Sequence, residues 1–124
     1  MAAPNLASPT TITGKTVYVA LSTTSATSVL SNAAASGKVL KVNSLVVSNV
    51  NGTASAAITV AVYSAAAIGG TPYRVARTIV VPANATLVVI DKTSMVYLEE
   101  DKSIGATAGT ANYLEVVCSY EEIS

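Results

Sequence analysis

Alternation of apolar and polar side chains is the feature that most constrains the fold of this chain. The predicted last strand, Asn112–Tyr120, and the residue after it show it best: one face carries Leu114, Val116, Cys118 and Tyr120, and the other carries Glu115, Ser119 and Glu121. A period of two indicates a β-strand with one buried face. No segment has the period of an amphipathic helix, beyond a single turn that residues 31–36 could form. The sequence therefore predicts an all-β protein.

Eight or nine short strands follow one another along the chain, at the spacing typical of antiparallel β-sandwiches. The candidates are Lys15–Leu21, Val29-Leu30, Val39–Val50, Ala57–Tyr63, Tyr73–Val81, Thr86–Ile90, Val96–Leu98, Ser103–Thr107 and Asn112–Tyr120. A length of 124 residues suits one domain. We therefore predict an extended N-terminal arm at residues 1–13 and one antiparallel sandwich at 14–124. Jelly-roll and immunoglobulin-like topologies both remain open.

The longest strand candidate, residues 39–50, loses its alternation midway. Its apolar side chains change parity from Leu40 and Val42 to Leu45 and Val47. Since a shift of one residue turns every side chain to the other face, a β-bulge near Asn43-Ser44 would restore a single core face. The alternative is a strand buried on both sides. A similar conflict at Arg77, in phase with the apolar residues of 73–79, predicts a bulge or a strand start there.

Turn residues separate several of these strands. Asn51-Gly52 is a strong turn signal after the longest strand. Pro82-Ala83-Asn84-Ala85 separates the apolar runs Thr78–Val81 and Thr86–Ile90, and we interpret it as a hairpin connection.

Two segments are candidates for contact with other subunits. The run Leu87, Val88, Val89 and Ile90 is apolar on both faces, whereas a strand of a two-layer sandwich needs only one buried face. A partner subunit would cover the second face, and the alternative cover is a loop of the same chain. In the arm, Pro4 and Pro9 favour extended backbone, with Leu6 and Ile12 as its large apolar side chains. The arm lies either on a neighbouring subunit or free as a tail.

Composition and charge exclude several functions. Charged residues are only 11% of the chain, against about 25% in an average soluble domain, and the net charge is zero. The seven basic residues are scattered, which argues against nucleic-acid binding. No apolar run reaches the ~18 residues that span a membrane, and the N-terminus lacks a secretory pattern. The low charge favours a surface that is partly buried in an assembly.

The sequence predicts no enzyme, no cofactor and no metal site. Histidine is absent, so Ser-His and Cys-His catalysis are excluded. The acidic group Glu99, Glu100 and Asp101, with Asp91 nearby, reads as a solvated loop, because its carboxylates do not face one another across a cleft. The one cysteine, Cys118, cannot form an intrachain disulfide and is expected to be a buried, inert thiol in a protein made in a reducing cytoplasm.

Several motifs resemble small virion proteins of tailed bacteriophages, especially cyanophages. They are V-P-A-x-x-T-L at Val81–Leu87, V-Y-L-x-E-D-x-S-I-G-A-T-A at Val96–Ala108, and L-E-V-V-x-S-Y-E-E-I at Leu114–Ile123, with similar stretches at Pro4–Thr16 and Lys38–Val50. The resemblance covers most of the chain, and its motifs are structural rather than catalytic.

The resemblance implies a β-sandwich building block of the virion, assembled in the host cytoplasm. The first expectation is a capsid decoration or cement protein on the capsid surface, which binds the major capsid protein and forms a homo-oligomer, with a trimer favoured by analogy. The alternatives are a neck, tail or fibre component and, from a different class, a carbohydrate-binding module. The last is disfavoured because the only aromatic residues are six tyrosines.

Overall fold

The computed structural model describes residues 4–124, which form nine β-strands. They are β1 (Ile12–Ala20), β2 (Thr27–Asn32), β3 (Val39–Asn49), β4 (Ala56–Ala65), β5 (Gly69–Val81), β6 (Thr86–Ile90), β7 (Val96–Leu98), β8 (Lys102–Ala108) and β9 (Leu114–Ile123). The predicted all-β class and strand count are confirmed. One boundary is corrected: β1 starts at Ile12, inside the predicted arm, because Ile12 and Thr13 already pair with β9.

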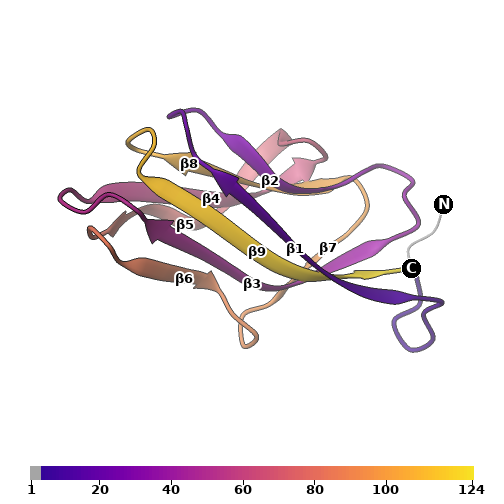
Figure 1. Cartoon of the computed structure of the whole chain (residues 1–124). Helices are drawn as coiled ribbons and strands as arrows, with labels where there is room; N and C mark the ends of the chain where they lie inside the picture. Colours follow the sequence, from indigo (N-terminus) through magenta and orange to yellow (C-terminus); the bar gives the residue numbers. More distant parts are fainter. Residues whose placement is uncertain (1–3) are drawn as a thin grey trace.

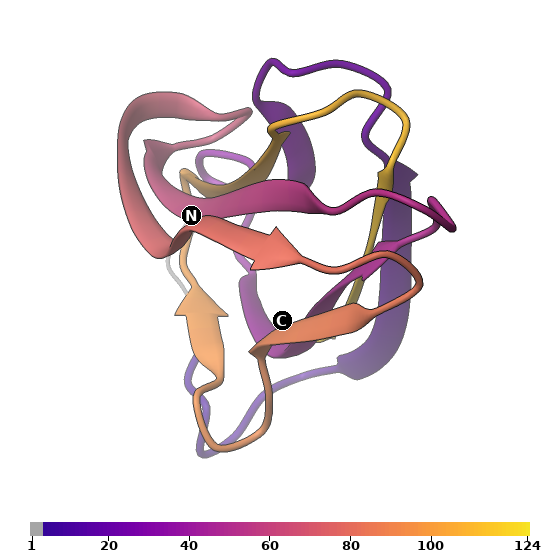
Figure 2. The ribbon, with the colours of Figure 1, turned by 90° about the vertical axis from the view of Figure 1, so that its left-hand side faces the viewer.

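The strands form two antiparallel sheets that face each other (Figures 1 and 2). Sheet I has the order β1-β9-β3-β6, with β7 also paired to β3, and sheet II has the order β2-β8-β4-β5. Only β4 and β5 are neighbours both in sequence and in a sheet; every other connection between the nine strands passes from one sheet to the other or skips a strand. Because β6 and β7 pair successively with β3, they act as one interrupted strand. The topology is therefore a jelly roll, the first of the two predicted alternatives.

The core lies between the sheets and consists of aliphatic side chains, one cysteine and one tyrosine. Its largest fully buried members are Leu21, Val42, Leu45, Val47, Ile58, Val60, Val81, Ile90, Leu98, Ile104, Leu114 and Val116. The alternation predicted for the last strand is confirmed, since Leu114, Val116, Cys118 and Tyr120 are all buried.

Both predicted irregularities are bulges. The pairing of β3 with β9 shifts between Val42 and Ser44, which leaves Asn43 as the extra residue and returns Leu45 and Val47 to the core face. In the pairing of β4 with β5, Ile58 faces Ile79 but Val60 faces Ala76, so β5 carries an extra residue at Arg77-Thr78. Thr78 has a positive φ of 47°, and its N–H donates a hydrogen bond to the Thr59 hydroxyl.

The predicted hairpin at Pro82–Ala85 is wrong. β5 belongs to sheet II, where it pairs with β4, whereas β6 belongs to sheet I, where it pairs with β3. Residues 82–85 therefore carry the chain from one sheet to the other. Alternation and turn residues identify where strands end, but in a jelly roll consecutive strands seldom pair.

Two buried asparagines tie the sheets together at strand ends. The Asn49 amide at the end of β3 donates to the carbonyls of Ala54 and Val81, each at 3.0 Å, and so links sheet I to the end of β5. The Asn32 amide at the end of β2 donates to the carbonyls of Lys38 and Leu98. These bonds satisfy polar groups that the strand ladders leave unpaired inside the protein.

The tip of the β4–β5 hairpin folds back over the outer face of sheet II. Three side chains accept hydrogen bonds from successive N–H groups of the tip: Asp101 from Ala66, Ser31 from Ala67 and Ser103 from Ile68. The side chains of Ile68 and Tyr63 then lie over Gly105 of β8, which is buried. Figure 2 shows the curled β4–β5 hairpin in pink, beside the other strands of sheet II. The protein thus covers part of one outer face with its own chain.

Candidate assembly surface

The outer face of sheet I carries a row of apolar side chains that crosses four strands. Tyr18 of β1 pairs with Val117 of β9, Val117 pairs with Val46 of β3, and Val46 pairs with Val88 of β6. Tyr18 is 80% exposed, Val88 57% and Val117 40%. Paired residues point to the same face of a sheet, so these side chains form a continuous stripe. We call them the apolar row.

Mostly polar residues flank the apolar row on both sides. One neighbouring row comprises Ala20, Glu115, Ser48 and Thr86, and the other comprises Thr16, Ser119 and Ser44. The hydroxyls of Ser48 and Thr86 bond each other at 3.0 Å, as do those of Thr16 and Ser119 at 3.5 Å. An apolar stripe bordered mainly by hydroxyl groups, with Glu115 as the one charged residue of the two bordering rows, has the character of a protein–protein contact surface.

β1 is an edge strand of sheet I and borders the apolar row (Figure 1). Its nine residues contain no proline, and its pairing with β9 runs without a bulge from Ile12 to Ala20. A shallow depression of about 270 Å³ adjoins it, lined by Tyr18, Val19, Ala20, Glu115, Val116 and Val117. The apolar row therefore ends at an open strand edge.

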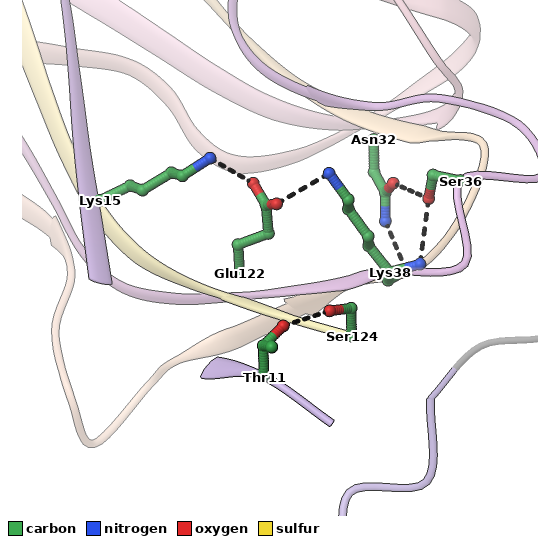
Figure 3. A network of polar contacts seen from close by, with 7 residues as sticks. All are labelled: Thr11, Lys15, Asn32, Ser36, Lys38, Glu122 and Ser124. Carbon is green, nitrogen blue, oxygen red and sulfur yellow. Dashed lines mark hydrogen bonds and ion pairs between the residues drawn. The ribbon is translucent and has the colours of Figure 1, made fainter. Parts of the chain in front are cut away.

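An ion-pair network closes the end of the sandwich near the C-terminus (Figure 3). The Glu122 carboxylate lies 2.7 Å from the Lys15 ammonium and 2.8 Å from that of Lys38. Hydrogen bonds from both lysines hold the pKa of Glu122 below its usual value, and the bond to Glu122 raises the pKa of Lys15. The network joins β1, β9 and the segment before β3.

The predicted arm is anchored to the C-terminus rather than fully extended. The N–H groups of Thr10 and Thr11 donate to the Ser124 carbonyl, and the Thr11 and Ser124 hydroxyls also bond. Asn5 forms a turn, accepting bonds from Ala7 at its side chain and from Ser8 at its carbonyl. Residues 1–3 of the predicted arm lie outside the described residues. Among the predicted interface residues of the arm, Leu6 and Ile12 are exposed, and Pro4 and Pro9 are half-buried.

The predicted interface in β6 is corrected at Ile90, which is 2% exposed and fills the protein's own core. The cause is a bulge in β6: Leu45 faces Ile90 whereas Val46 faces Val88. Leu87 and Val89 are partly buried and pack against the same core. Val88 is the member of this run that points outward, and it belongs to the apolar row.

Sequence reasoning missed the other members of the apolar row. Tyr18 alternates with the apolar residues Val17 and Val19 and so belongs to the opposite face of its strand. Val46 and Val117 are each flanked on their own face by polar residues, at positions 44 and 48 and at positions 115 and 119. Only the strand order brings the three together with Val88. A large aromatic residue on the solvent face of a strand was the one signal in the sequence. β5 was likewise not singled out, although Tyr73, Val75, Ile79 and Val80 are exposed on it.

The acidic residues serve as local structure in this fold. Asp101 caps the hairpin tip, and Asp91 accepts bonds from Thr93 and Ser94, which lower its pKa. Within residues 4–124, no three His, Cys, Asp or Glu side chains gather where they could hold a metal ion. Cys118 is fully buried, and its burial raises the thiol pKa to about 11.

Comparisons with known proteins show a likeness in fold. No protein family matches the sequence, and no curated protein is similar to it. Among solved structures, a chain from Bacillus endospore appendages, described as disulfide-linked pili, is similar with a TM-score of 0.54 and 16% identity, over 92% of this chain and 88% of that one. In the part of the chain that the structure describes, no helix is long and apolar enough to cross a membrane.

Proposed function

We propose that this chain is a structural subunit of a repeated protein assembly, and specifically a virion protein of the capsid-decoration type that binds the major capsid protein shell. The observation that carries the proposal is the apolar row, which ends at the open edge of β1. A surface of this kind suits contact with other subunits, whereas nothing in its chemistry suits a substrate. The proposal that this assembly is a virion is based on the resemblance of the sequence motifs to phage virion proteins. The proposal includes no catalytic step and no cofactor.

A second candidate is a neck, tail or fibre component, favoured by the fold shared with a pilus protein. The disulfides named for those pili have no counterpart here, because the one cysteine is enclosed in the core. Any polymer of this chain is therefore held by contacts other than disulfide bonds. Such a polymer should come apart in denaturant without a reducing agent.

Copy number in purified virions separates the two candidates. Quantitative mass spectrometry should find the chain in hundreds of copies if it decorates the capsid, and in a dozen or fewer if it belongs to a neck or fibre. Absence of the chain from virions of the phage that encodes it would refute both.

A surface variant tests which face makes the contact. Val117→Lys places a charge in the middle of the apolar row, and it should lower occupancy on capsids without lowering the melting temperature. Val75→Lys on β5 is the matched control, because Val75 has a similar exposure of 45% but lies on sheet II. Equal loss of occupancy in both variants would exclude the apolar row as the contact surface. A homo-oligomer is part of the proposal, and mass measurement in solution tests it; the number of subunits, three by the resemblance, is not.

A further inference from the structure

The backbone groups on the open edge of β1 belong to alternate residues. In antiparallel pairing, every second residue bonds its neighbour through both N–H and C=O. Thr11 exchanges bonds with Ser124, and Leu21 donates to Leu114, so the odd-numbered residues of β1 face β9. The even-numbered residues therefore point their N–H and C=O groups away from the sheet; they are Ile12, Gly14, Thr16, Tyr18 and Ala20.

β1 has few of the features that protect an edge strand from pairing. Natural edge strands are protected by proline, by bulges or by charged side chains, which can point outward or inward. β1 has no proline and no bulge, and its one charged residue is Lys15. The Lys15 ammonium lies 2.7 Å from Glu122 of β9, on the inner side of the sheet and away from the open edge.

We propose that β1 pairs antiparallel with β1 of a second copy of this chain, about a two-fold axis that passes beside Thr16. The pairing joins two copies of sheet I into one continuous sheet. It goes beyond the proposed virion role and does not depend on it.

Backbone hydrogen bonding and side-chain fit both favour this register. With Thr16 opposite Thr16, all outward N–H and C=O groups of both strands find partners, whereas any other register leaves some of them unpaired. It also places Tyr18 opposite Gly14 of the second copy. An added Cβ at Gly14 would meet no atom within 4 Å, so there is open space for the tyrosine ring. An aromatic ring across from a strand glycine is a stabilising cross-strand arrangement.

The ends of the paired strands fit as well. Ile12, 58% exposed, comes to lie opposite Ala20 of the second copy, beside the shallow depression that Tyr18, Ala20 and Glu115 help to line. The depression offers the isoleucine an apolar surface in place of water.

Charges do not oppose this pairing. The outward side chains of β1 are uncharged, and Thr16 faces its own copy, so two hydroxyls meet at the axis. Lys15 comes opposite Val17 rather than opposite the second Lys15, and its charge is already paired with Glu122. Glu121 of β9, which pairs with Gly14, already accepts a hydrogen bond from the Asn43 amide of β3. Like charges directly opposite each other would have disfavoured the contact.

The interface between the two β1 strands is small, so the expected affinity is low. Nine paired residues span about 31 Å of strand. A single strand edge of that length buries less than a standard protein interface, so a reversible dimer with a dissociation constant on the order of 1–100 µM is expected. A two-fold pair gives a dimer, whereas the resemblance implies a trimer, and the mass of the particle distinguishes them.

The first test is analytical ultracentrifugation of the full chain from about 1 to 500 µM, a range that brackets the expected dissociation constant. The wild type should pass from monomer to dimer. Thr16→Lys puts two lysines together at the axis and should weaken the dimer at least about tenfold. Thr86→Lys is the control: it adds the same charge to an exposed residue of the same face, at the opposite edge of sheet I, and should leave the dimer unchanged. Both variants should keep the wild-type melting temperature in the monomer range.

The second test reads the register by cross-linking with a short bismaleimide. Thr16→Cys should be cross-linked to itself, whereas Ala20→Cys should not, because two such residues would lie eight positions apart, about 27 Å. Buried Cys118 gives no background. A wild type that stays monomeric over this range, a trimer, or efficient cross-linking at residue 20 but not at 16 would each overturn the proposal. A dimer that survives Thr16→Lys but is lost when residues 2–9 are deleted would also overturn the proposal, because the N-terminal arm of one copy, rather than its β1, would then bind the β1 edge of the other.

Discussion

Gly105 of β8 is a buried position where a single added methyl group should destabilise the fold. In Gly105→Ala, the new Cβ would lie 2.8 Å from Cγ2 of Ile68, 2.8 Å from Cε1 of Tyr63 and 3.4 Å from the carbonyl of Thr27. The first two distances are far below contact distance, so the hairpin tip must move outward. Overpacking of this kind costs about 1–3 kcal/mol.

The hairpin cannot move without disturbing its hydrogen bonds. Ile68 donates to the Ser103 hydroxyl at 2.8 Å, and Ser103 is fully buried, so loss of this bond takes a partner from a group that water does not reach. A net hydrogen bond contributes about 0.5–1.5 kcal/mol. If the tip lifts off, the total loss for Gly105→Ala rises to about 2–4 kcal/mol.

Urea unfolding of the monomer measures this loss, with Gly52→Ala as the control. Gly52 also has no positive φ, and an added Cβ there would meet only Asn84 at an ordinary 3.8 Å. It should therefore be neutral or slightly stabilising, because alanine lowers the entropy of the unfolded chain. In the double variant Gly105→Ala/Ile68→Ala, part of the clash is removed, so the two changes should cost less together than their sum. A loss below about 0.5 kcal/mol for Gly105→Ala would refute the packing argument.

Three further predictions concern buried or paired polar groups. Asn49→Ala removes the link from β3 to Ala54 and Val81 and should lower the free energy of unfolding by about 2–4 kcal/mol, measured by denaturant titration. Glu122→Gln should lower the melting temperature by a few degrees at pH 7. Because the pKa of Glu122 is depressed in the folded protein, its contribution is present above its unfolded pKa and disappears as the pH falls through the folded one; a difference between wild type and variant that persists at pH 2 would contradict this. Cys118 should react with a thiol reagent at pH 8 only at the rate of unfolding or opening, so rapid labelling of the native protein would show that the core is not closed.

Side-chain patterns in the sequence predicted strands and faces but not strand partners. Parity alone located the bulge beside Asn43, because a change of face within one strand has few other physical causes. The same kind of pattern misled at Leu87–Ile90, where a second bulge turned Ile90 into the core, and two adjacent apolar faces looked like a surface awaiting a partner. The difference is one of length: β3 has eleven residues over which parity can be read, and β6 has five.

The candidate surface depended on strand order, which local sequence does not contain. Tyr18 and Val117 are 99 positions apart in the chain, yet they are neighbours on one face. Their contact follows from the pairing of the first strand with the last in the jelly roll. Such long-range pairings depend on the whole set of sheet contacts rather than on any one segment. The buried Asn32 and Asn49 were missed for the same reason, since one partner of each, Leu98 or Val81, lies on a strand of the other sheet.

The two outer faces of the sandwich are treated differently by the chain, and this asymmetry bears on function. On sheet II, a hairpin tip held by three side-chain hydrogen bonds covers Gly105, and Ile68 takes a left-handed backbone conformation with φ of 52° to do so. That conformation is unfavourable for a β-branched residue. No hairpin tip covers the apolar row of sheet I, where Tyr18 is the most exposed of the large apolar side chains in residues 4–124. The chain thus accepts strain to cover part of sheet II, whereas the apolar row, which crosses four strands of sheet I, stays open to water. The proposed contact therefore lies on sheet I and its β1 edge, and variants of exposed apolar residues on β5 of sheet II, such as Val75→Lys, are the controls.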